Sequence, residues 1–129
     1  MLVKFALMFA ALCLGFTVLT IINFWQIDHV GTRFLAGREF RSLWTFWGFY
    51  GLLAAPGVVF ANVLFWAMYY YGLHFWFKKL WVIQISAYAA GLIVMAVITW
   101  LWYGEVPNKG TLLGIFLCVA GAFTSIFWK

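Results

Sequence analysis

The stretch Trp100–Phe123 reads WLWYGEVPNKGTLLGIFLCVAGAF, and it decides how the chain is organised. An uncharged aromatic run leads up to Gly104, a short turn with one glutamate and one lysine follows, and a second apolar run begins at Gly110. Long apolar runs separated by a polar turn are typical of two helices that cross a bilayer. The stretch therefore predicts the last helical hairpin of a membrane protein.

The composition of the whole chain agrees with this prediction. Of its 129 residues, 67% are hydrophobic and 9% are charged, whereas about a quarter of the residues of a soluble globular domain are charged. The net charge of +5 is spread over termini and loops, as is ordinary beside anionic lipid. We expect a single membrane domain over residues 1–129, with membrane lipid as a partner and no nucleic acid partner.

Further uncharged runs precede the opening stretch. A helix that crosses about 30 Å of hydrocarbon needs about 20 residues at 1.5 Å per residue, and each run is at least close to that length. The expected fold class is an all-α membrane protein with four transmembrane helices. Their expected spans are about 5–27, 43–72, 80–103 and 110–128.

The second run, 43–77, is longer than one straight crossing requires and contains Pro56 followed by Gly57. Proline cannot donate to the helix ladder and crowds the preceding turn. We therefore expect helix two to be kinked at Pro56, either as a fixed packing kink or as a hinge formed by Pro56 and Gly57. Its tail, FWAMYYYGLHFW at 65–76, is typical of an aromatic belt at the headgroup interface.

The basic residues give the insertion machinery almost no orientation signal. If the N-terminus is inside, the basic side chains inside are Lys4, Lys78, Lys79 and Lys129. Those outside are then Arg33, Arg38, Arg41 and Lys109. Because orientation follows the Lys/Arg balance, either a partner fixes it or both orientations occur.

The opening stretch resembles the last two helices of the drug/metabolite transporter superfamily. The shared elements are a tryptophan before an aromatic pair, the Gly104–Glu105 end of helix three, a short polar turn, Gly114, and Ala120–Gly121 in helix four. The chain is similar above all to the small multidrug resistance proteins and to the paired four-helix subunits that flip undecaprenyl-phosphate-linked aminoarabinose. The resemblance covers about the last third of the chain. It implies transport by a homodimer, or by a heterodimer with a similar four-helix subunit, in the bacterial inner membrane.

Helix one departs from the multidrug members, which carry an intramembrane glutamate there. The segment FALMFAALCLGFTVLTIINFW, at 5–25, contains no acidic residue. Asp28, Glu39 and Glu105 are the only acids, and we expect all of them at boundaries or in loops. A charge inside the membrane is costly and implies a function, so its absence disfavours proton coupling and favours the lipid-flippase subunits as nearer relatives.

Polar and aromatic residues of helices two and three are the candidates for a substrate site. Asn62 and Gln84 need hydrogen-bond partners in lipid, and a helix-to-helix hydrogen bond is the alternative interpretation of each. The candidate substrate-binding residues are Asn62, Trp66, Tyr69, Tyr70, Gln84 and Tyr88. Glu105 is expected to be a hydrated helix end or a partner of Lys109.

Small residues recur along helix four and let helix backbones approach closely. The expected helix–helix interface consists of Gly110, Gly114, Cys118, Gly121 and Ala122. Its partner is either helix three of the same chain or helix four of another subunit. We favour the second alternative because the last helix is the dimer contact in the multidrug relatives.

Catalytic and metal-binding patterns are not evident. We expect a polar cluster of Asp28, His29 and Arg33 after helix one, and the two histidines lack ligand spacing, so neither a metal nor a cofactor is expected. Cys13 and Cys118 are expected to be buried thiols without a disulfide. The protein is then not an enzyme but a transporter or flippase subunit for an amphipathic or polyprenyl-lipid-linked substrate. The alternative is a non-transporting accessory subunit that scaffolds a larger membrane complex.

Overall fold

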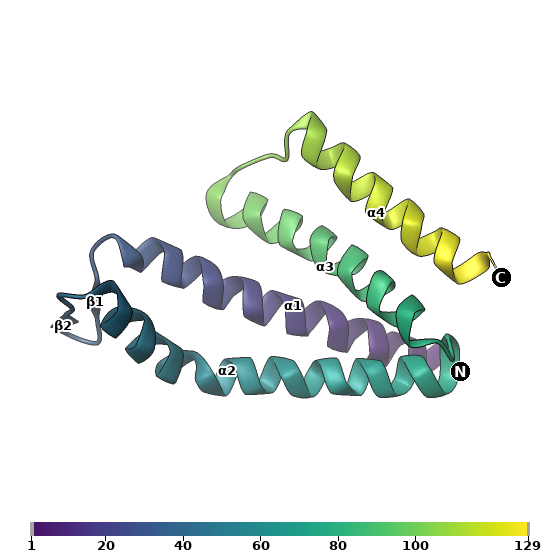
Figure 1. Ribbon diagram of the computed structural model, residues 1–129, viewed down its shortest axis with the longest axis horizontal. Coiled ribbons are helices and arrows are strands. Elements are labelled where there is room, and N and C mark those ends of the chain that lie inside the picture. Colours follow the sequence, from purple (N-terminus) through teal and green to yellow (C-terminus); the bar gives the residue numbers. More distant parts are fainter. Residues whose placement is uncertain (1, 129) are drawn as a thin grey trace.

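The computed structural model describes residues 2–128, and it is built almost entirely from helices (Figure 1). Four of them are long and apolar enough to cross a membrane, as expected for an integral membrane protein. They are α1 (Leu2–Val30), α2 (Leu43–Tyr71), α3 (Leu80–Tyr103) and α4 (Lys109–Phe127). The prediction of four helices that could span a membrane is confirmed by their length and apolar composition.

The observed helix ends follow the predicted spans closely. Helix α3 occupies 80–103 as predicted, and α2 begins at Leu43 as predicted. Helix α4 begins and ends one residue earlier than predicted, and α1 extends beyond 5–27 at both ends. Helix α2 runs through Pro56 without interruption, since membrane helices tolerate an internal proline.

The aromatic tail of the second run ends in a π-helical turn, η1 (Gly72–Trp76). The backbone N–H of Phe77 closes this turn by donating to the carbonyl of Gly72 at 2.9 Å. Lys78 then adopts a left-handed φ of 54°, a conformation that reverses the chain so that α3 can begin at Leu80. Lys78 and Lys79 thus lie in the short connection between η1 and α3.

A two-stranded hairpin interrupts the connection between α1 and α2, where the sequence analysis placed no strand. Strand β1 (Phe34–Leu35) pairs antiparallel with β2 (Arg38–Glu39). Ala36 and Gly37 both have positive φ, 51° and 77°, which is the geometry of a two-residue type I′ turn.

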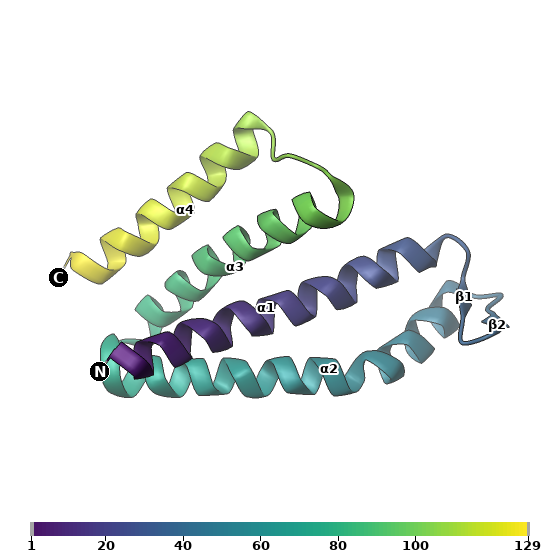
Figure 2. The ribbon, with the colours of Figure 1, turned by 180° about the vertical axis from the view of Figure 1, so that it is seen from behind.

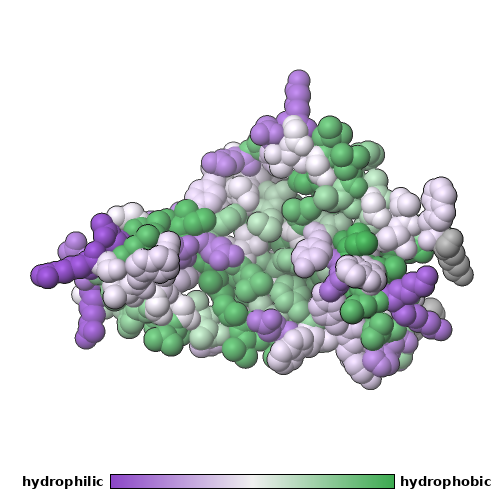
Figure 3. All heavy atoms as spheres, viewed as in Figure 1, coloured by the Kyte–Doolittle hydropathy of each residue, from purple (hydrophilic) through white to green (hydrophobic). Residues whose placement is uncertain are grey.

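The helices pack as a chain of neighbours. Helix α1 contacts both α2 and α3, and α4 contacts α3. Figures 1 and 2 show α4 on the far side of α3 from α2. Hydrophobic residues cover the broad middle of the face in Figure 3, and hydrophilic residues gather at its ends, as a bilayer requires. Helix α4 therefore packs mainly on α3.

Close backbone contacts join the first three helices at glycines. An added Cβ at Gly91 of α3 would lie 2.5 Å from Cζ of Phe16, and one at Gly57 of α2 would lie 2.8 Å from Cδ1 of Ile22. The Phe16 ring also meets Phe65 of α2, with centroids 5.0 Å apart. Phe16 thus lies where α1, α2 and α3 meet. Small residues allow such approach where lipid removes the hydrophobic drive.

Gly91→Ala should destabilise the fold, because the new Cβ overlaps the Phe16 ring. We expect the free energy of unfolding to fall by about 1–3 kcal/mol, the usual cost of overpacking. Gly48→Ala is the matched control, since nothing lies within 4 Å of a Cβ there, and alanine favours a helix over glycine. Denaturant unfolding in detergent measures both. Equal shifts in the two variants, or no rescue of Gly91→Ala by Phe16→Leu, would contradict this contact.

Candidate functional site

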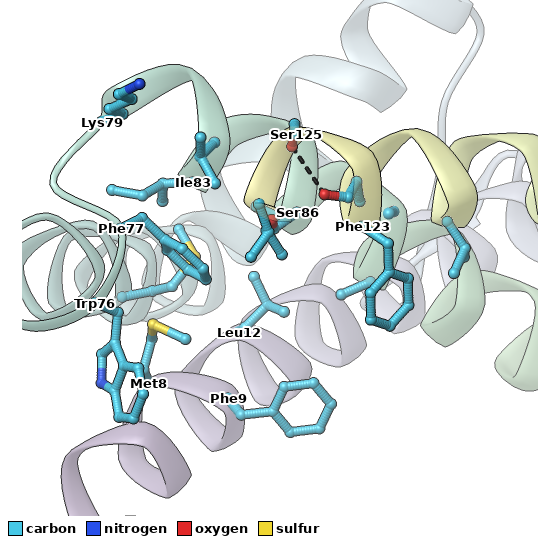
Figure 4. Close-up of a pocket in the computed structure, with 18 of the residues that line it drawn as sticks. Met8, Phe9, Leu12, Trp76, Phe77, Lys79, Ile83, Ser86, Phe123 and Ser125 are labelled. Atoms are coloured by element: carbon cyan, nitrogen blue, oxygen red, sulfur yellow. Dashed lines mark hydrogen bonds between the residues drawn. The ribbon is translucent and has the colours of Figure 1, made fainter. Parts of the chain in front are cut away.

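The main cavity lies between α1, η1, α3 and the C-terminal half of α4 (Figure 4). Its volume is about 710 Å³, within the range of about 300–1,000 Å³ that is usual for small-molecule sites. Its lining is predominantly apolar and includes Met8, Phe9, Leu12, Ile83, Ala90 and Phe123. The candidate substrate residues were expected on helices two and three, whereas this cavity is bounded by α4 and receives only Met68 from α2.

Small side chains on α3 leave space for this cavity. Three alanines, Ala87, Ala89 and Ala90, lie on the wall that α3 contributes. The floor belongs to the hydrophobic core, where Met8 and Leu12 of α1 are buried against Ile83 and Ala87. The cavity thus has buried core residues on one side and a wall of small alanine side chains on another.

The cavity wall also holds polar atoms that the protein itself does not satisfy. Among the described residues, the indole nitrogen of Trp76 and the hydroxyl of Ser86 are buried without a hydrogen-bond partner, and both residues line the cavity. Ser125 differs, because its hydroxyl donates to the carbonyl of Ala122 at 2.8 Å (Figure 4). A buried unsatisfied group costs about 1–3 kcal/mol, so a side-chain movement that brought either atom to an acceptor on a ligand would recover part of that cost.

One end of the cavity is basic and aromatic. Lys79 belongs to the lining, as do Phe127 and Trp128, which are highly exposed. Lys4 lies at the same end, with Nζ 3.7 Å from the ring centroid of Phe75 in η1. We call the end of the molecule formed by Lys4, Lys78, Lys79 and Trp128 the mouth.

A second cavity, of about 270 Å³, lies between α2 and α3 beside Phe16. It brings together four of the predicted substrate residues, namely Asn62, Trp66, Tyr69 and Tyr88. The Asn62 amide donates to Val58 of its own helix at 2.9 Å. Within the described chain the exposed amide of Asn62 thus bonds its own helix rather than a neighbouring one.

Tyr70 and Gln84 lie in neither cavity lining. Tyr70 is 55% exposed and packs against His74, with ring centroids 4.5 Å apart. Gln84 is half-buried on α3. Both were predicted as substrate residues from their residue type alone. Their positions around the helices keep them out of the two cavity linings.

The small residues of α4 are mostly uncovered within the described chain. No atom lies within 4 Å of a Cβ built at Gly114 or Gly121, and Cys118 is exposed. At Gly110 the only atom that close is Oδ1 of Asn108, the helix N-cap, at 3.4 Å. Only Ala122 is buried, and it faces the main cavity. Packing against α3 of the same chain thus uses one residue of the predicted interface.

The molecule is tied together at the end opposite the mouth by Asp28. Its carboxylate accepts hydrogen bonds from Trp102 Nε1 at 2.9 Å and from the Tyr103 hydroxyl at 2.8 Å. Phe24, one turn earlier in α1, packs on the Tyr103 ring with centroids 5.1 Å apart. We call this set, Phe24, Asp28, Trp102 and Tyr103, the latch. It joins the last turn of α1 to the last turn of α3.

The latch corrects the predicted cluster of Asp28, His29 and Arg33. Asp28 belongs to α1 and binds α3, while His29 stacks on Trp25 with centroids 3.8 Å apart. Arg33 donates to the carbonyl of Arg41 at 2.9 Å. The sequence feature that could have indicated this interaction is the Trp102–Tyr103 pair. Its two side chains can donate hydrogen bonds, and they lie at the same membrane boundary as Asp28.

The remaining charged and thiol groups have simpler places. Glu105 is exposed in the turn before α4, as expected for a hydrated helix end. Cys13 is half-buried and Cys118 exposed, both as free thiols, so the expectation that both are buried is wrong for Cys118. Within residues 2–128, no three histidine, cysteine or acidic side chains are grouped so that they could hold a metal ion.

Asp28→Ala should loosen the latch, because two aromatic donors lose their acceptor. We expect faster hydrogen–deuterium exchange in peptides that cover the last turns of α1 and α3, with the middle of α2 unchanged. Glu105→Gln is the matched control, as it neutralises an exposed carboxylate near the same boundary. Identical exchange in wild type and Asp28→Ala would show that the latch contributes nothing to closure.

Comparison with known proteins gives no match to this chain among protein-family models, curated proteins or solved structures. The resemblance of the last third to drug/metabolite transporters therefore rests on the quoted residues, and the function must be argued from the cavity, the mouth and the latch.

Proposed function

We propose that the protein is a small membrane transporter or flippase subunit that binds an amphipathic or polyprenyl-lipid-linked molecule. The observation that carries this proposal is the main cavity, which has apolar walls, unsatisfied polar atoms and a basic mouth. An amphipathic molecule needs this combination, since its chain seeks apolar walls while its headgroup seeks polar partners. The four apolar helices place the cavity at a membrane, which we take to be a bacterial inner membrane.

Movement of the substrate would require the two ends of the molecule to open in turn. In the observed state the latch joins α1 to α3 at one end, while the cavity reaches the mouth at the other. Pro56 and Gly57 are the proposed kink and hinge of α2, because Pro56 leaves one carbonyl of the helix ladder unsatisfied. Gly57 contacts Ile22 of α1, so bending there would move the two helices relative to each other.

The proposed transport is not coupled to protons through an intramembrane carboxylate, and no catalytic step is involved. All acidic residues lie at the end away from the mouth: Asp28 in the latch, Glu39 in β2 and Glu105 in the α3–α4 turn. The smaller cavity with Asn62, Trp66, Tyr69 and Tyr88 is a proposed second contact surface along the path.

Ala90→Leu should reduce transport by filling the main cavity. The expected result is at least a several-fold lower rate of fluorescent phospholipid flipping in proteoliposomes, scored by dithionite quenching. Ala96→Leu, on the same helix but outside both cavity linings, should flip lipid at the wild-type rate. The wild-type rate should also be the same with and without a pH gradient. Equal rates in the two alanine variants would contradict the proposed site, and strict gradient dependence would contradict uncoupled transport.

The alternative function, an accessory subunit of a larger complex, is favoured by the uncovered side of α4. The same surface would serve a homodimer or a heterodimer with a similar four-helix subunit. Close packing of small-residue helix faces is the usual basis of such contacts in membranes.

Gly114→Leu should weaken subunit association without unfolding the chain, because its Cβ meets no atom of the same chain. We expect a loss of about 1–3 kcal/mol of association free energy if another helix packs there. Leu113→Phe, which adds bulk outside the predicted interface, is the control. Analytical ultracentrifugation in mild detergent measures both. An oligomer that Gly114→Leu leaves intact would exclude this surface as the subunit contact.

A further inference from the structure

The charged residues of the chain are divided unequally between its two ends. The mouth carries three described basic side chains, Lys4, Lys78 and Lys79, and none of the acidic ones. The opposite end carries all three acids of the sequence together with Arg33, Arg38, Arg41 and Lys109. No acidic side chain of the described residues lies near these lysines, so an anionic group is attracted to that end.

One of the three lysines of the mouth lines the cavity itself. Lys79 lines the cavity and is also the N-cap of α3, but its side chain makes no cap hydrogen bond. The first turn of α3 adds N–H groups and the positive end of its dipole at Lys79, but α4 ends at the same cavity with its negative C-terminal end. The positive charge of the mouth therefore comes mainly from the lysines. Lys4 is held over Phe75 beside this turn.

Two buried atoms of the cavity wall favour an oxygen-bearing ligand. The indole N–H of Trp76 can only donate, and the Ser86 hydroxyl can donate as well. Both lack a partner within the described residues. Phosphate and ester oxygens are acceptors that would satisfy them once a side-chain rotation exposes them to the cavity, and the neighbouring Met8 and Leu12 offer an apolar surface for a chain.

We propose that the main cavity binds an anionic phospholipid, with the phosphate at Lys79 and an acyl chain along α1 and α3. This inference rests on the proposed function and names the headgroup charge that the site selects. A phosphate diester with net negative charge fits the mouth, whereas a zwitterionic headgroup brings its own cation against the lysines. Because each lysine near such a headgroup is worth about 1 kcal/mol, selection between chain-matched lipids is expected to be several-fold.

Native mass spectrometry of the purified protein in dodecyl maltoside tests the proposal with equimolar dioleoylphosphatidylglycerol and dioleoylphosphatidylcholine. The anionic lipid should be retained at least about fivefold better. Lys79→Gln should remove most of this preference, whereas Lys109→Gln, the same change at the opposite end, should keep it. Ser86→Ala should weaken retention of both lipids. Added glycerol 3-phosphate should not displace the bound lipid, because the chain contributes to binding.

The outcomes separate this inference from the proposed function. Equal retention of the two lipids, or an equal loss in the two lysine variants, would overturn the headgroup assignment. If Ala90→Leu still reduced retention in that case, the cavity would remain the amphiphile site. Displacement by glycerol 3-phosphate would overturn the lipid assignment in favour of a free phosphate ligand. No retention of either lipid, with Ala90→Leu indistinguishable from wild type, would overturn both.

Discussion

The arrangement of the helices depends on the contact between the Phe16 ring and Gly91. Lipid is as apolar as the side chains, so burial of apolar surface does not drive helices together in a bilayer, and close packing decides which faces meet. At Gly91 the absence of a side chain lets Phe16 lie against the backbone of α3. The same ring packs on Phe65 of α2, so one aromatic residue fixes three helices. Helix α4 lies outside this junction and packs mainly on α3, and the main cavity lies between α4, α3 and α1.

Polar interactions then give the molecule two different ends. Few hydrogen-bonding side chains lie within the apolar helices, so each one that crosses between helices has a large influence on geometry. Asp28 joins α1 to α3 at one end, and the hydroxyl of Tyr50 bonds the carbonyl of Ile22 between α2 and α1. In the wall of the main cavity, by contrast, Trp76 and Ser86 are left without partners among the described residues. A closed, satisfied end and an open, unsatisfied end are what a protein that admits an amphiphile from one side requires.

Length and hydropathy were sufficient to predict the helices but not how they pack. The span 80–103 could be predicted because Lys79 and Gly104 bound an uninterrupted apolar run, and Gly104 ends the helix with a φ of 68°. The faces could not be predicted, since a helix that is apolar all round has no polar side to mark its outside. Asn62 and Gln84 looked equivalent in the sequence, yet only Asn62 reaches a cavity. Asp28 was misplaced because its partners are distant in sequence, and the proposed kink at Pro56 is still a prediction.

Photo-crosslinking of a phospholipid whose acyl chain carries a diazirine is the most direct test of the account, because it maps where the chain lies. Labelling in proteoliposomes should concentrate on the cavity wall, at Met8, Leu12 and Ala90, and should fall when unlabelled lipid competes. Leu52 on α2 is 75% exposed and should carry only weak labelling that competitor does not reduce. Labelling spread evenly over all exposed helix faces, with the cavity residues no stronger than Leu52, would contradict the claim that this cavity is the amphiphile site.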